Sequence, residues 1–246
     1  MLRRIAENYA AVTAMVADAC REAGRDPNGV MIVGVTKYAG IDAAMAVFEA
    51  GCRDLAESRP QELWRKAEAF QAAGLRPRWH LIGHLQRNKV RRTLPLVHLF
   101  HSLDSVRLLR AIDEDARAAG RVADLLVEAN LDGSVGRTGA AIADVPSLVA
   151  EAAGCAGIRV RGLMGMASQP EEGSDAVAAT RRQFAMLREL RDSLRATTNA
   201  ESLSELSMGM SGDFREAILE GSTIVRIGSA LFEGTAPAEN EPNPRT

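Results

Sequence analysis

Eight short apolar segments alternate with helical patterns along this chain of 246 residues. The segments lie near 30–36, 54–58, 78–83, 96–103, 122–130, 160–166, 205–210 and 224–231. The helical patterns between them include Ile41 to Ala50, Gln61 to Ala73, Ser105 to Ala119, Val145 to Ala153, Ala176 to Leu194 and Asp213 to Leu219. Strict strand–helix alternation requires parallel strands, and eight such units ordinarily close into a barrel with the helices outside. The sequence therefore predicts an α/β fold, a single (β/α)8 TIM barrel.

The alternative with the same alternation is an open, doubly wound parallel sheet. No Gly-x-Gly-x-x-Gly follows the first apolar segment, where a dinucleotide-binding sheet carries its phosphate turn, and this favours the barrel. An amphipathic helix is expected before the first strand. We expect the barrel domain to cover 1–233 and a disordered tail, rich in proline and poor in apolar residues, to cover 234–246.

Charge and cysteine content limit the kind of partner. The 30 Lys and Arg residues nearly balance the 32 Asp and Glu residues, so no basic field suggests nucleic acid and a small ligand is favoured. Three cysteines without Cys-x-x-Cys spacing fit buried thiols in a reducing compartment. No signal peptide and no apolar run of about 20 residues is found, so we expect a cytoplasmic protein that does not enter membranes. The four histidines lack a metal-ligand spacing, and no metal is expected.

Lys37 closes the first apolar segment, Val30 to Thr36. Such a lysine is either a solvated loop residue or an amine in a dry pocket, where a lowered pKa makes it a nucleophile that forms Schiff bases with aldehydes. In a barrel, chemistry lies at the C-terminal ends of the strands, which is where Lys37 is expected.

The last two predicted strands also end in polar or small residues. Gly228 and Ser229 follow strand eight, where backbone N–H groups at the start of a short helix bind phosphate in many barrels, and Ser207 with its neighbouring glycines can add donors. The alternative is that these glycines only form tight turns. Arg226 lies inside an apolar strand and needs an acceptor, which a pyridine nitrogen could provide.

Several motifs occur in order along the chain and together resemble one known family. They are Val35-Thr36-Lys37, the segment from Gly51 to Glu62, Trp79 to Lys89, Arg161 to Met164, Leu206 to Ser211, and Val225 to Phe232. The combination resembles the pyridoxal phosphate (PLP) homeostasis proteins, which are similar to the N-terminal barrel domain of alanine racemase. The resemblance implies PLP binding of fold-type III.

The resemblance also implies roles for individual residues. Lys37 would carry the internal aldimine, Arg226 would face the pyridine nitrogen, and Ser207, Gly228 and Ser229 would hold the phosphate. The expected cofactor-binding residues are Lys37, Ser58, His80, Ser207, Met208, Arg226, Gly228 and Ser229.

Two positions depart from the family pattern. Ser58 stands where the family usually has asparagine, and Arg137 stands where it often has lysine. A role of that lysine as a second amine for PLP does not carry over to Arg137, because guanidinium forms no Schiff base under ordinary conditions.

Three functions remain open at this point. The first is a non-catalytic PLP carrier that sequesters the cofactor and delivers it to apo PLP-dependent enzymes, as a monomer or weak homodimer. The second is a PLP-dependent amino-acid racemase, which needs general bases on both faces of the substrate carbanion. The third is a barrel that binds another phosphorylated metabolite without covalent chemistry.

The chain has two tyrosines that could serve as the second base, Tyr9 in the leading helix and Tyr38. If Lys37 and Tyr38 both lie on an extended strand, the Tyr38 side chain should point away from Lys37. No C-terminal β domain is expected after Phe232. These features favour the carrier.

Overall fold

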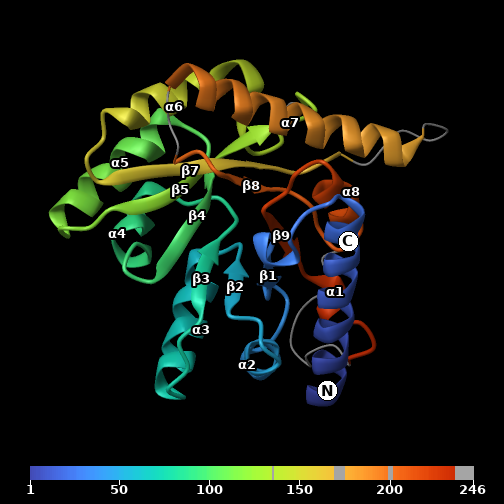
Figure 1. Ribbon diagram of the computed structural model, residues 1–246. Coiled ribbons are helices and arrows are strands. Elements are labelled where there is room, and N and C mark those ends of the chain that lie inside the picture. The colour runs from blue at the N-terminus through green and yellow to red at the C-terminus, as the bar shows by residue number, and fades with distance from the viewer. Residues whose placement is uncertain (135, 169–174, 199–201, 236–246) are drawn as a thin grey trace.

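The predicted alternation of strands and helices closes into a barrel in the computed structural model, which describes residues 1–134, 136–168, 175–198 and 202–235 (Figure 1). The strands are β1 (Met31–Val35), β2 (Asp54–Glu57), β3 (Arg78–Leu81), β4 (Val97–Leu103), β5 (Ala123–Asn130), β6 (Ala140–Ala141), β7 (Ile158–Gly165), β8 (Glu205–Ser207) and β9 (Ile224–Ile227). All pairings are parallel, and β1 pairs with both β2 and β9, which closes the sheet. The prediction of a (β/α)8 barrel is confirmed, with β6 as a short addition beside the end of β5.

The helices surround this barrel. The α-helices are α1 (Leu2–Glu22), α2 (Ile41–Glu49), α3 (Pro60–Ala72), α4 (Val90–Thr93), α5 (Val106–Ala118), α6 (Val145–Ala153), α7 (Ala176–Thr198) and α8 (Phe214–Leu219). Short 3-10 helices are η1 (Pro27–Gly29), η2 (Arg87–Lys89), η3 (Ile142–Asp144) and η4 (Ser229–Leu231). Among the described residues, no helix combines the length and apolar character that a membrane crossing requires.

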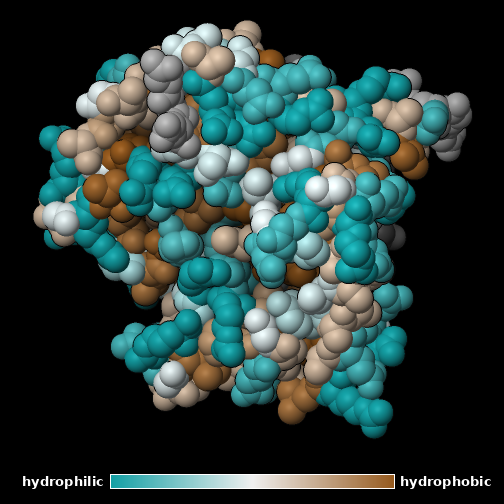
Figure 2. Space-filling view, viewed as in Figure 1, coloured by the Kyte–Doolittle hydropathy of each residue, from teal (hydrophilic) through white to brown (hydrophobic). Residues whose placement is uncertain are grey.

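Two apolar clusters separate the inside of the barrel from its outside. The smaller cluster consists of strand residues that alternate along their strands, namely Val33, Val35, Ala56, Leu99, Leu126, Met164 and Ile224. The larger one joins the other strand faces to helix residues such as Phe70 of α3 and Phe184 of α7. Because side chains of a strand point alternately to opposite faces, the smaller cluster fills the barrel interior. In the same orientation as Figure 1, hydrophilic residues cover much of the outer surface, with smaller hydrophobic areas between them (Figure 2).

The N-terminal helix is present as predicted, and α1 packs against α2, α8 and η4. In Figure 1 it lies along one side of the barrel, next to α8. The Asn8 side-chain amide donates hydrogen bonds to the carbonyl oxygens of Leu231 and Glu233, at 3.1 and 2.9 Å, so the chain after β9 is tied to the first helix. Thr235 is still described, whereas 236–246, most of the predicted tail, lie outside the described residues.

The last two strands are shorter than the predicted segments 205–210 and 224–231. β8 ends at Ser207 because the chain turns at Gly209, whose φ of +95° is a conformation that side chains with a Cβ rarely adopt. β9 ends at Ile227 because the chain enters η4 at Ser229. Both early ends bring small polar residues to the C-terminal rim of the barrel.

Candidate functional site

A cleft of about 1270 Å³ lies at the C-terminal end of the barrel. Its walls come from residues after β1, β2, β3, β7, β8 and β9, the position at which TIM-barrel enzymes carry their active sites. Of the sequence-predicted site residues, the lining includes Lys37, Ser58, Arg226, Gly228 and Ser229. The fold therefore brings five of the eight predicted residues to one cleft.

Lys37 lies in the turn after β1 and its side chain is exposed. Its Nζ is 5.0 Å from the centroid of the Tyr38 ring, which also lines the cleft. Of the two alternatives for Lys37, the structure shows the solvated loop residue, and the expectation that Tyr38 points away from Lys37 is wrong. The reason is that β1 ends at Val35, so Lys37 and Tyr38 lie in a turn. Their side chains therefore do not point to opposite faces, as they would on an extended strand.

A buried ion pair supports the backbone on which Lys37 and Ser58 are carried. Lys66 of α3 is 1% exposed, and its Nζ donates to Glu57 Oε1 and to the Thr36 carbonyl oxygen, each at 2.6 Å. The Thr36 hydroxyl donates to the same carboxylate oxygen, also at 2.6 Å. Thr36 precedes Lys37 and Glu57 precedes Ser58, so this cluster fixes the ends of β1 and β2 at the rim. Sequence reasoning missed it, because Lys66 resembles any polar residue of an amphipathic helix.

Arg226 of β9 is 3% exposed and reaches the floor of the cleft. Its Nη1 donates to the Ser207 carbonyl and to Ser207 Oγ, both at 2.7 Å, and its Nη2 donates to the Gly165 carbonyl at 3.1 Å. A guanidinium has five N–H donors, so the Nε donor and one Nη2 donor remain without an acceptor among the described residues. Burial lowers the pKa of Arg226 to about 10, against the opposing effects of Asp213 and Glu128. At neutral pH the side chain is a cation with two donors left for a ligand.

The ends of β8 and β9 meet at one wall of the cleft. The backbone N–H groups of Gly228 and Ala230 both donate to Ser211 Oγ, at 3.2 and 3.4 Å. Ser211 lines the cleft together with Gly228 and Ser229, so two serine residues lie at this wall, and the Ser211 hydroxyl is held by two backbone N–H groups. Sequence reasoning chose Ser207 and passed over Ser211, although both belong to the motif from Leu206 to Ser211. The turn at Gly209 is what carries Ser211 back to the rim.

The other three predicted residues are buried inside the protein and do not line the cleft: His80, Ser207 and Met208 are all fully buried. His80 Nε2 lies 3.0 Å from Asp54 Oδ1, and His80 Nδ1 lies 2.9 Å from His101 Nε2. Ser207 Oγ lies 2.9 Å from His101 Nδ1 and accepts from Arg226. His80 and Ser207 therefore lie behind Arg226 and do not line the cleft.

Burial is the largest influence on the pKa values of the hydrogen-bonded residues His80, His101 and Asp54. It lowers the pKa of His80, an effect that hydrogen bonding to Asp54 partly offsets. Burial, with His80 and Arg226 nearby, lowers the pKa of His101 well below its usual value. Burial alone would raise the pKa of Asp54, but hydrogen bonds from His80 and Arg78 outweigh it and hold that pKa below its usual range. Both histidines are therefore neutral at neutral pH, and Asp54 is a carboxylate.

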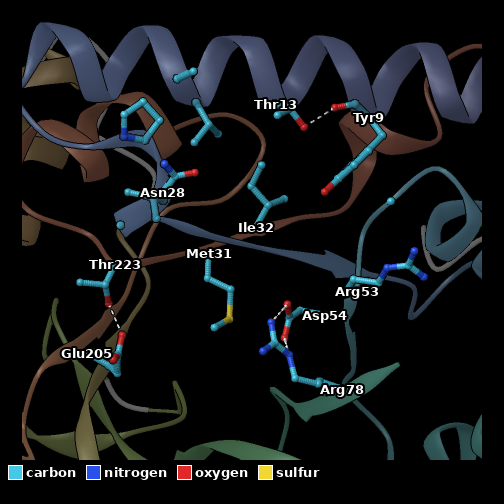
Figure 3. Close-up of a pocket in the computed structure, with 16 residues that line it drawn as sticks. Tyr9, Thr13, Asn28, Met31, Ile32, Arg53, Asp54, Arg78, Glu205 and Thr223 are labelled. Atoms are coloured by element: carbon cyan, nitrogen blue, oxygen red, sulfur yellow. Dashed lines mark hydrogen bonds and ion pairs between the residues drawn. The ribbon is translucent and has the colours of Figure 1, made fainter. Parts of the chain in front are cut away.

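The opposite end of the barrel has a second cavity of about 560 Å³, drawn in Figure 3. It is lined by the first residues of several strands and by α1, and it includes Tyr9, Asp54, Arg78 and Glu205. Tyr9 therefore lies at the N-terminal end of the barrel, away from Lys37. Within the described ranges, no group of three or more His, Cys, Asp or Glu side chains is arranged to hold a metal ion.

Arg137, which replaces the lysine common in the family, forms an ion pair with Asp132 and donates to the Ala167 carbonyl at 3.3 Å. It is not part of the cleft lining.

Comparison with known proteins agrees with this geometry. The profile of the family described as "Alanine racemase, N-terminal domain" matches residues 2–236. The chain is 36% identical over 226 residues to the pyridoxal phosphate homeostasis protein of Aquifex aeolicus, covering 92% of this chain and 96% of that protein. It is 37% identical over 229 residues to the protein of the same name from Pseudomonas aeruginosa, covering 93% and 94%.

Solved structures give the same relationship. PipY of Synechococcus elongatus with PLP bound has a TM-score of 0.78 and 29% identity, covering 93% of this chain and 99% of that chain. An alanine racemase of Clostridium difficile shares the fold at a TM-score of 0.71 and 13% identity, and the match covers 95% of this chain but 58% of the racemase. The barrel, the matching profile and the two relatives above 30% identity lead to one conclusion: the chain belongs to the alanine racemase N-terminal domain family, and within it to the pyridoxal phosphate homeostasis proteins.

Proposed function

We propose that this protein binds PLP in the cleft, with Lys37 as the amine that bonds to the cofactor, and that it sequesters PLP in the cytoplasm and delivers it to apo PLP-dependent enzymes. The observation that carries the proposal is the cleft itself, where an exposed primary amine, an arginine with two remaining donors and a wall formed by Ser211, Gly228 and Ser229 converge. When bound, PLP supplies an aldehyde that condenses with a primary amine.

The donor set fits the three polar parts of PLP. Lys37 provides the amine, and Ser211, Gly228 and Ser229 form the wall that suits a phosphate, in a barrel region where loops after the last strands often bind phosphate. The remaining Arg226 donors suit a pyridine nitrogen, because an arginine donates and does not accept. Ser58, which also lines the cleft, remains a predicted contact.

His80, Ser207 and Met208 keep a different place in this proposal. They lie behind the cleft lining, so we assign His80 and Ser207 to the support of Arg226 and leave the phosphate to Ser211, Gly228 and Ser229.

The non-catalytic carrier is favoured over a racemase by the position of the tyrosines. Racemisation needs a second base across the substrate from the lysine. Tyr9 lies at the far end of the barrel, and the Tyr38 ring lies beside the Lys37 amine. Arg226 at the pyridine nitrogen would also oppose ring protonation and weaken the electron sink that PLP enzymes use. We therefore propose a protein without amino-acid racemase activity, which acts as a monomer or weak homodimer.

The function predicts transfer without turnover. The purified protein is expected to bind PLP with a visible absorption band, to restore activity to an apo PLP-dependent enzyme, and to racemise L- or D-alanine no faster than free PLP does. Reactivation assays and chiral chromatography measure the two activities. Turnover well above free PLP that disappears in Lys37→Ala would identify a racemase instead, and the absence of any PLP band would favour a barrel for another phosphorylated metabolite.

The phosphate wall gives a separate prediction. Ser229→Asp is expected to weaken PLP binding by about 2 kcal/mol, because a carboxylate would face the phosphate and a donor would be lost. Fluorescence or absorbance titration measures the affinity. Ser147→Asp, at an exposed position of α6, is the matched control and should bind PLP like the wild type. Equal affinity in the two variants would remove Ser229 from the site.

A further inference from the structure

A continuous hydrogen-bonded chain crosses the barrel interior from the cleft to the opposite end. It runs from Arg226 through Ser207, His101 and His80 to Asp54, with successive contacts of 2.7, 2.9, 2.9 and 3.0 Å. We call these five residues the interior relay. Asp54 is held in turn by Arg78, which donates from Nε and Nη2 to the two carboxylate oxygens at 2.7 and 2.5 Å. Arg78 and Asp54 line the cavity at the N-terminal end, where Figure 3 shows their paired contacts.

The strand register explains why these side chains meet. His80 is paired with Ala56, a residue of the interior cluster, and Ser207 is paired with Met164 and Ile224, which belong to the same cluster. Asp54 is two residues before Ala56, and Arg226 is two residues after Ile224. Side chains two apart on a strand share a face, so the relay replaces part of the apolar filling of the barrel with polar groups. Such groups are costly to bury unless each one has a partner.

The two ends of the relay fix the direction of every hydrogen bond in it. A guanidinium has no acceptor and a carboxylate has no donor. Arg226 therefore donates to Ser207 Oγ, and at the other end His80 Nε2–H donates to Asp54. Neutral His80 then has a bare Nδ1, which accepts from His101 Nε2–H. His101 Nδ1 is bare in turn and accepts the Ser207 hydroxyl proton.

We propose that Asp54, His80 and His101 are positioning residues for Arg226, in that the Asp54 carboxylate sets both histidines to the Nε2–H tautomer and so turns the Ser207 oxygen toward Arg226. This inference rests on the proposed function, since Arg226 is the group assigned to the PLP ring. The opposite tautomer of His101 would donate to Ser207 Oγ, and the serine proton would then be directed at the guanidinium. The relay prevents that arrangement and keeps the two remaining Arg226 donors in place for the cleft.

The substitution Asp54→Asn tests the inference from the far end of the barrel. An amide at position 54 can donate as well as accept, so His80 is no longer confined to one tautomer. The matched control is Asp124→Asn. Asp124 also receives two hydrogen bonds from an arginine of the neighbouring strand, Arg159, at 2.6 and 3.0 Å, but no histidine is bonded to it. Both variants therefore weaken an aspartate–arginine ion pair between neighbouring strands. Only Asp54→Asn also changes a residue of the relay.

Two measurements are made on the full-length protein. Side-chain ¹⁵N NMR assigns the histidine tautomers without PLP, and titration with PLP gives the affinity. We expect wild type and Asp124→Asn to carry the proton of His80 and His101 on Nε2 alone. We expect Asp54→Asn to show mixed tautomers and about tenfold weaker PLP binding, the scale for weakening one hydrogen bond to a charged group. A wild-type His101 protonated on Nδ1, or equal PLP affinity in the two variants, would overturn the inference.

A second pair of variants covers the case in which Asp54→Asn does not fold. His101→Asn places Oδ1 where the histidine has Nδ1 and keeps an acceptor for Ser207, whereas His101→Leu removes it. PLP binding is expected to be retained better in the asparagine variant, by about tenfold, and equal affinities would contradict the inference. Because the tautomers are measured without PLP, a wild type that shows the predicted tautomers but binds no PLP would refute the proposed function and leave the relay geometry standing.

Discussion

Replacing Lys37 with alanine is expected to abolish the covalent attachment of PLP and to leave the barrel folded. The chain has three lysines, of which Lys66 is 1% exposed in a buried ion pair and Lys89 lies in η2, outside the cleft lining. Lys37 is thus the lysine that lines the cleft. Its side chain is exposed, so its removal should change the free energy of unfolding by no more than about 0.5 kcal/mol.

Borohydride reduction followed by peptide mass mapping measures this directly. The wild type should carry a phosphopyridoxyl group on Lys37, Lys37→Ala should carry none, and Lys89→Ala, as the control, should be labelled like the wild type. A label found on Lys66 or Lys89 in the wild-type protein would show that the amine has been assigned to the wrong residue.

The largest effect on stability is expected from Lys66→Met, at about 3–5 kcal/mol of lost unfolding free energy. The substitution would leave the Glu57 carboxylate fully buried without its cation, and Glu57 Oε2 already has no hydrogen-bond partner among the described atoms. It would also remove the bond from Lys66 to the Thr36 carbonyl, next to Lys37. PLP binding should therefore weaken together with stability.

Urea unfolding, with the double variant Glu57→Gln and Lys66→Met beside the single one, separates the charge effect from the packing effect. The double variant should recover part of the loss, because no buried charge remains. Arg65→Met removes an exposed pair with Glu62 on the same helix and should change the unfolding free energy little. A single variant as stable as the wild type would show that the Lys66–Glu57 pair does not hold the rim.

The relay lies inside the barrel, and a second polar cluster of Lys66, Glu57 and Thr36, here called the rim cluster, lies between the barrel and α3. Each of the two is linked to the cleft through one residue. In the relay this residue is Arg226, and in the rim cluster it is Thr36, which precedes Lys37. In the relay Arg78 pairs with Asp54, and in the rim cluster Lys66 pairs with Glu57, so each buried carboxylate has a cation within the protein.

The sequence alone was enough to predict the barrel and much of the cleft lining, because both depend on local sequence patterns. Strand and helix patterns are set by neighbours in the chain, and parallel strands place all their C-terminal ends at one rim, so Lys37, Gly228 and Ser229 could be assigned to one site before any distance was known. The strand end decided one detail: the orientation predicted for Tyr38 assumed an extended strand, whereas the turn after Val35 places its ring beside the Lys37 amine.

The tertiary structure decided which interior residues meet. His101 and Ser207 are 106 residues apart, and Lys66 reaches a carboxylate on a different element, so no local pattern reports either contact. Those contacts depend on the stagger between strands and on the closure of β9 onto β1, which set the height of each side chain along the barrel axis. Sequence periodicity tells which face of a strand a residue occupies, and only closure of the barrel tells what stands across from it.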